Sequence, residues 1–234
     1  MPIANIDGQL RLQTNEDGPM PMKALTEAFQ KLKYNEKLND RNIRSLIGFI
    51  DSFITVSTHA NTVGKDVARI AKEVNEHHHT KTCAKSGDRC LFHYPKPPAP
   101  YTIIVQPNKE SSIDWEQSRV IIDKVMDVLS DDKIIEKIME KYDKDNEDQK
   151  SYCENRVKRI KDVCKMGNVE ALGMSKTVYS VVKARDIDEL CINPYNEEWL
   201  RPWNRNMDIQ PVLDFFAVIT YLTDYYSKDD TALW

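Results

Sequence analysis

The chain has 234 residues, of which 41% are hydrophobic and 30% charged, and its formal net charge is −4. This composition is typical of a folded, mildly acidic protein and argues against a chain that coats nucleic acid by bulk positive charge. No basic segment followed by an apolar stretch opens the sequence and no apolar run is long enough to span a membrane, so we expect a protein that is neither secreted nor membrane-bound. Five cysteines without an export signal favour reduced or metal-bound thiols over disulfides.

The first part of the chain divides into an irregular and a helical segment. Residues 1–20 mix Asn, Asp, Gly and Pro, and we expect them to be disordered. Residues 21–76 are predicted to be helical, because apolar residues recur there at helical spacing in three runs. The runs are Leu25, Phe29 and Leu32; Leu46, Ile47, Ile50, Phe53 and Ile54; and Val63, Val67, Ile70, Ala71 and Val74. The last run ends at Asn75, and the prolines of residues 95–100 mark a boundary beyond it.

Residues 101–234 mix strand and helix patterns. The β-branched segments 101–105 and 176–185 predict strands, and the alternation of apolar and polar residues over 207–210 predicts another. Helices are predicted after N-caps at Ser112 and Ser130, around Val157, Ile160 and Val163, and from Pro211 to the C-terminal region. The expected fold class is therefore α+β, helix-rich with a small sheet.

Histidine and cysteine gather in the segment NEHHHTKTCAKSGDRCLF. Zn²⁺ takes four tetrahedral nitrogen or sulfur ligands, and a short polar loop can supply them without burying a core. The spacing His-x-His-x₃-Cys-x₆-Cys predicts a zinc-binding loop over residues 77–100, with the ligands His77, His79, Cys83 and Cys90. His93 is a substitute ligand in this interpretation.

Two other interpretations of the segment stay open. One is a surface run of histidines beside two free cysteines. The other takes His77 and His79 as the His-hydrophobic-His pair that holds the catalytic metal of rolling-circle nucleases. Against the second stands His78, because the middle residue of that motif is apolar and the pair lies on a buried strand.

The predicted C-terminal helix is amphipathic. Its polar face carries Tyr221 and Tyr225 four positions apart, followed by Lys228. A nuclease could present two phenols to one phosphate track in this way. A phenol has a pKa near ~10 and is a weak nucleophile at neutral pH, so this chemistry also needs a Lewis acid on the phosphate. The alternative is an amphipathic helix with exposed tyrosines and no chemistry.

Aromatic and basic side chains interleave just before this helix. Aromatic stacking combined with guanidinium contacts is typical of single-strand binding. Arg201, Trp203, Arg205 and Asn206 are therefore candidate DNA-binding residues. For the rings of Trp199 and Trp203, burial as core anchors is the alternative.

Two blocks of the sequence, HHHTKTCAKSGDRCLFHYPKPPAPYTIIV and INPYNEEWLRPWNRNMDIQPVLDFFAVITYLTDYYSK, resemble the Rep region of Helitron transposon proteins, the rolling-circle replicase-helicases. The weaker likeness around them runs from about Ile47 to Lys228. The resemblance implies a Rep-like (HUH-type) nuclease fold with a zinc loop formed by the His/Cys set above. It also implies that Tyr221 and Tyr225 are the nucleophiles, with Lys228 beside them, and that a complete enzyme would use Mg²⁺ or Mn²⁺.

The sequence also departs from the family. The His-hydrophobic-His strand should precede the FIDSFIT segment, but His59 is the only histidine before the cluster. Glu197 stands where the family usually has proline, and no Gly-x₄-Gly-Lys-Ser/Thr phosphate loop is present, so neither ATP hydrolysis nor a helicase half is expected.

These features predict a fragment of a Helitron-like transposase or replication initiator. It would bind single-stranded DNA and carry tyrosines for nicking and strand transfer, without an evident catalytic metal site, and a helicase domain or chain would be supplied elsewhere. Its location would be nuclear, inferred from the DNA role, or otherwise cytoplasmic. The alternative is a non-catalytic, zinc-stabilised module that binds nucleic acid or protein.

Overall fold

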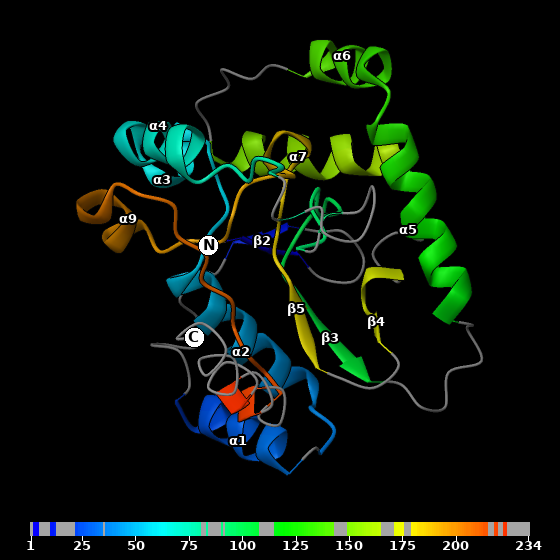
Figure 1. The fold of residues 1–234 in the computed structure, drawn as a ribbon. Helices are drawn as coiled ribbons and strands as arrows, with labels where there is room; N and C mark the ends of the chain where they lie inside the picture. Colours follow the sequence, from blue (N-terminus) through cyan, green and yellow to red (C-terminus); the bar gives the residue numbers. More distant parts are fainter. Residues whose placement is uncertain are drawn as a thin grey trace, which may run out of the picture.

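The described part of the chain combines helices with two small sheets (Figure 1). The computed structural model describes residues 2–4, 10–12, 22–34, 36–80, 83, 90, 92–107, 115–142, 149–164, 171–175, 179–214, 218–219 and 222–223. The helices are α1 (Met22–Lys33), α2 (Asp40–Phe53), α3 (Ala60–Val63), α4 (Lys65–Val74), α5 (Trp115–Leu129), α6 (Asp132–Lys141), α7 (Gln149–Cys164) and α9 (Glu197–Trp203), with the 3-10 turn η1 (Ile187–Glu189). The strands are β1 (Pro2–Ala4), β2 (Leu10–Leu12), β3 (Ile103–Pro107), β4 (Met174–Ser175) and β5 (Ser180–Val182). The α+β class is confirmed, and none of the described helices has the length and apolar character needed to cross a membrane.

The larger sheet has the order β4-β3-β5, with β3 parallel to β4 and antiparallel to β5. In Figure 1, α2 lies along the β5 side of this sheet and α5 along the β4 side. The strand predicted at 101–105 is found two residues later, and only Ser180–Val182 of the predicted segment 176–185 is a described strand.

Two sequence predictions about strands are wrong. Pro2–Ala4 pairs antiparallel with Leu10–Leu12, so residues 1–20 contain regular structure that three-residue segments are too short to reveal by pattern. No strand forms at 207–210. The backbone N–H groups there bond to other partners, since Met207 N donates to the Asn75 side chain and Ile209 N donates to the Pro194 carbonyl.

Three helix boundaries also differ from the prediction. Gly64, at φ 83°, breaks the run from Val63 to Val74 into α3 and α4, a backbone conformation that glycine adopts without a Cβ clash. The N-cap of α6 is Asp131, whose carboxylate accepts from two backbone N–H groups, whereas the Ser130 hydroxyl donates to the Asp127 carbonyl at 2.6 Å. Pro211 does not begin a helix, because residues 211–214 are irregular. The predicted cap Ser112 lies outside the described residues.

The early helices and the later part of the chain share two apolar cores. The first core joins α4 to Ile192, Tyr195 and Leu200, and the second joins α1 and α2 to Ile104, Tyr179 and Leu213. Isolated β-bridges add Thr55 to Tyr195, Glu76 to Ile192 and Ala99 to Arg185. Segments that are far apart in the sequence therefore meet at residues 185–195.

Candidate metal centre

Hydrogen bonds of Asn75 fix the end of α4, two residues before His77, the first predicted ligand. Asn75 caps α4 and is fully buried; its side-chain amide donates to the Asn193 carbonyl at 2.7 Å and its oxygen accepts from Met207 N at 2.6 Å. The backbone N–H of His77 then donates to the Cys191 carbonyl at 2.7 Å. The first predicted ligand is thus anchored to the strand-like segment around residue 192.

The four predicted zinc ligands come together. Cys90 Sγ lies 3.3 Å from His77 Nε2, and Cys83 Sγ lies 3.7 Å from His79 Nδ1. The donor atoms of His77, His79, Cys83 and Cys90 all lie within 4.8 Å of one another. Such a group of two imidazoles and two thiols could hold a metal ion.

The structure does not support two of the assignments considered for these histidines, the catalytic His-hydrophobic-His pair and His93 as a substitute ligand. Residues 77–80 have no regular structure, whereas a His-hydrophobic-His pair needs a buried strand. His93 does not belong to the ligand group; it is exposed and lines a separate hollow together with residues of α5.

The surroundings favour the ligand forms of Cys90 and His77. Burial acts to raise the pKa of Cys90, but the nearby backbone N–H groups of Tyr94 and Phe92 stabilise the thiolate and the net pKa is lowered. Burial, assisted by the neighbouring His79 and His78, lowers the pKa of His77. The sulfur of Cys83, which is 2% exposed, accepts from Thr80 N at 3.1 Å. A thiolate and neutral imidazoles are the species that bind zinc, so the donor set fits that ion.

The predicted DNA-binding residues lie on α9 and directly after it. Leu200 is fully buried and anchors the helix, while Trp203 is 63% exposed. Arg201 Nε pairs with Asp66 at 2.6 Å in an exposed ion pair, and Arg205 is exposed. The side-chain oxygen of Asn206 accepts from Asn193 at 2.8 Å.

Neither tryptophan of α9 is a core anchor. Trp199 is 52% exposed and meets the ring of Phe53 edge-on at 5.1 Å. Trp199 and Trp203, together with Pro202 and Met207, line an open apolar hollow of about 380 Å³. Exposed indole rings beside an apolar hollow can bind flat, apolar groups by stacking.

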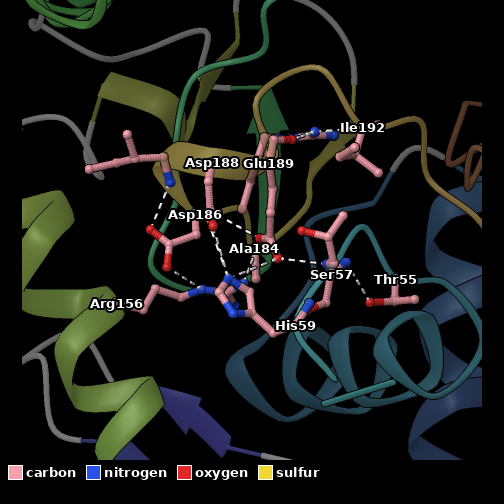
Figure 2. A network of polar contacts seen from close by, with 12 residues as sticks. Thr55, Ser57, His59, Arg156, Ala184, Asp186, Asp188, Glu189 and Ile192 are labelled. Atoms are coloured by element: carbon pink, nitrogen blue, oxygen red, sulfur yellow. Dashed lines mark hydrogen bonds and ion pairs between the residues drawn. The ribbon is translucent and has the colours of Figure 1, made fainter. Parts of the chain in front are cut away.

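A polar network that the sequence did not reveal lies between α7, η1 and the segment before α3. In Figure 2, Asp188 and Glu189 face the ring of His59, and Arg156 approaches from α7. His59 Nε2 lies 3.3 Å from Asp188, and Arg156 Nη2 lies 2.7 Å from Glu189. These residues are distant in sequence and show no common spacing; the only signal was the acidic run after Arg185.

Donor atoms of His59, Asp186 and Asp188 also lie within 4.8 Å of one another. The guanidinium of Arg159 pairs with Asp186 and lies 3.5 Å from Asp188. A positive group therefore already lies between the two carboxylates that a cation would bridge. We interpret this network as a structural ion cluster.

The three residues predicted for chemistry, Tyr221, Tyr225 and Lys228, lie outside the described residues. Comparison of the chain with protein-family models, curated proteins and solved structures found no match.

Proposed function

We propose that the chain binds single-stranded DNA as a Rep-like (HUH-type) protein of the Helitron class, with a structural zinc ion held by His77, His79, Cys83 and Cys90. The observation that carries the proposal is the convergence of these four donors within 4.8 Å. Zinc would supply a rigid cross-link between the two ends of the loop. It takes no part in chemistry in this role.

Hydrogen bonds link the start of the zinc loop to the segment that follows α9. Asn75, two residues before the first ligand, bonds to Asn193 and Met207, and Asn193 in turn donates to Asn206. Fixing the loop therefore also fixes the chain that follows α9. The exposed ion pair between Arg201 and Asp66 is weak in water, so a DNA phosphate can replace the carboxylate.

Removal of the Trp203 ring tests the DNA-binding surface. Stacking of one base on an aromatic ring contributes about 1–3 kcal/mol, so Trp203→Ala should weaken binding of a labelled oligo(dT) by roughly 5- to 150-fold in fluorescence anisotropy at low salt. Tyr34→Ala is the matched control, because Tyr34 is 67% exposed and lies at the end of α1. Equal affinities of Trp203→Ala and the wild type would remove α9 from the DNA-binding surface.

The tyrosines add a strand-transfer reaction to this proposal. The phenolic oxygen of Tyr221 or Tyr225 would bond to phosphorus and the bond from phosphorus to the 3′ oxygen would break. The products are a 5′-phosphotyrosine and a 3′-hydroxyl, which takes the proton. The second tyrosine would allow a second transfer without release of the strand.

For the isolated chain we expect DNA binding without a covalent adduct. A phenol needs electrostatic stabilisation of the phosphate, and the cluster around Asp186 is occupied by Arg159. The assay is denaturing electrophoresis after incubation with single-stranded DNA and Mn²⁺ or Mg²⁺. An adduct that disappears in the double variant Tyr221→Phe, Tyr225→Phe would establish a working nuclease instead.

A zinc-stabilised binding module without catalysis is the second candidate function, favoured by the open apolar hollow beside Trp203. It predicts unchanged DNA binding in the double tyrosine variant and no adduct under any metal. If no single-stranded DNA binds even at low salt, the hollow would instead serve a protein partner.

A further inference from the structure

Tyr94 contacts one of the four candidate ligands, His77, and lies in the turn that follows another, Cys90. Its ring stacks on the His77 imidazole, with centroids 4.4 Å apart and planes at 17°. The residue before it, His93, donates its backbone N–H to the Cys90 carbonyl at 3.0 Å, which ties the segment of Tyr94 to Cys90. The Tyr94 residue is only 6% exposed, so its ring is shielded from water.

The segment that carries Tyr94 is itself held in place. The backbone N–H of Lys96 donates to the Leu190 carbonyl at 2.9 Å, and its ammonium donates to the Phe92 carbonyl at 2.6 Å. The same ammonium lies 4.9 Å from the centre of the Tyr94 ring, a cation–π contact. The position of the Tyr94 ring is therefore fixed by its neighbours.

The four candidate ligands form two pairs, which differ in how far apart their members lie in the sequence. His79 and Cys83 are close in sequence, and a local turn joins them, since Cys83 N donates to the Thr80 carbonyl at 3.1 Å. His77 and Cys90 lie thirteen positions apart, yet their donor atoms are 3.3 Å apart. Holding this second pair together requires a residue outside the pair.

We propose that Tyr94 is a positioning residue for the metal centre, which orients the His77 ring toward the Cys90 sulfur before the ion binds. This inference rests on the proposed zinc function and deepens it. Without the ring, His77 would gain side-chain freedom that must be lost again on metal binding, and the affinity would fall. Supporting groups of this kind typically change metal affinity by about 10- to 100-fold.

The hydroxyl of Tyr94 is not required for this role. It is buried and has no hydrogen-bond partner among the described residues. Removing a buried, unpartnered hydroxyl carries little penalty. Tyr94→Phe should therefore keep wild-type zinc affinity, whereas Tyr94→Leu keeps apolar bulk and the backbone N–H but lacks the flat ring.

The test is a zinc titration against a competing chelator with the wild type, Tyr94→Phe, Tyr94→Leu and Phe92→Ala. We expect Tyr94→Leu to bind about 10- to 100-fold more weakly. Tyr94→Phe should be unchanged, and Phe92→Ala nearly so, because Phe92 is 55% exposed and meets His77 only edge-on. The absorption spectrum of bound Co²⁺ should be altered in Tyr94→Leu alone, and circular dichroism of each apo-protein checks the fold.

Two different results would overturn the inference, and they distinguish a failure of the positioning role from a failure of the proposed zinc function. If Tyr94→Leu binds zinc as tightly as the wild type and gives the same Co²⁺ spectrum, Tyr94 does not position the ligands although the metal site stands. If the wild type binds no zinc, the proposed metal function itself is lost.

Discussion

Glu189→Ala is expected to lower the free energy of unfolding by about 3–5 kcal/mol. Glu189 is fully buried and accepts from Thr58 N at 3.0 Å, from Asp186 N at 2.8 Å and from Arg156 at 2.7 Å. The variant leaves two backbone N–H groups without this acceptor. It also leaves the Arg156 guanidinium with Asp186 Oδ2, 3.6 Å from its Nε, as its remaining ion-pair partner in this network. Loss of one member of a buried pair is costly because the other charge stays out of water.

Urea unfolding followed by circular dichroism measures this effect. Glu73→Ala is the matched control, because Glu73 pairs with Arg69 on the surface, where the two side chains are 54% and 62% exposed. Exposed ion pairs contribute little, so the control should stay within about 0.5 kcal/mol of the wild type. If Glu189→Ala unfolds at the same urea concentration as Glu73→Ala, the network does not hold α7, η1 and the segment before α3 together.

This network marks the limit of what the sequence could predict. The group of four possible metal ligands was predicted from spacing because all four lie within fourteen positions, His77 to Cys90, and a short loop brings such residues together. The partners His59, Arg156 and Glu189 meet because packing in two apolar cores brings three distant segments to one place. Contacts between residues so far apart in the sequence leave no local pattern from which they could be predicted.

The helices illustrate the same distinction. The apolar stripe of α4 follows from the 3.6-residue period and was predicted correctly, since Val67, Ile70 and Ala71 are buried. The stripe of α2 was predicted only in part, because Leu46 and Ile50 are buried whereas Phe53 is 38% exposed. The break at Gly64 depends on one backbone angle, which no hydrophobic pattern reveals. Residues 207–210 alternate like a strand, yet their backbone N–H groups are bonded to Asn75 and Pro194 instead of to a neighbouring strand.

The exposure of the two tryptophans of α9 is also decided by tertiary packing and not by a local sequence pattern. Sequence alone left the rings of Trp199 and Trp203 open between core and surface, since large aromatic rings occur in both places. In the fold, Leu200 takes the buried position of α9 and turns both indoles outward. Single-strand binding by these rings stays a prediction for the anisotropy experiment.

Cys90→Ala is expected to weaken zinc binding by at least roughly 100-fold. Structural zinc sites bind with about 10–16 kcal/mol, and one of four ligands accounts for about 3 kcal/mol of this if they contribute equally. The cost falls on Cys90 because its sulfur lies 3.3 Å from His77 Nε2, within the group of four donor atoms.

Cys191→Ala is the control that separates ligation from the mere presence of a thiol nearby. Cys191 is half-buried and outside the ligand group, and its backbone carbonyl, which alanine keeps, accepts from His77 N. Its replacement should leave both zinc affinity and the zinc-dependent rise of the melting temperature intact, whereas Cys90→Ala should lose that dependence, because an ion that binds only the folded state stabilises it by mass action. Equal zinc affinities of the two variants would remove Cys90 from the ligand set and leave a site of at most three protein ligands.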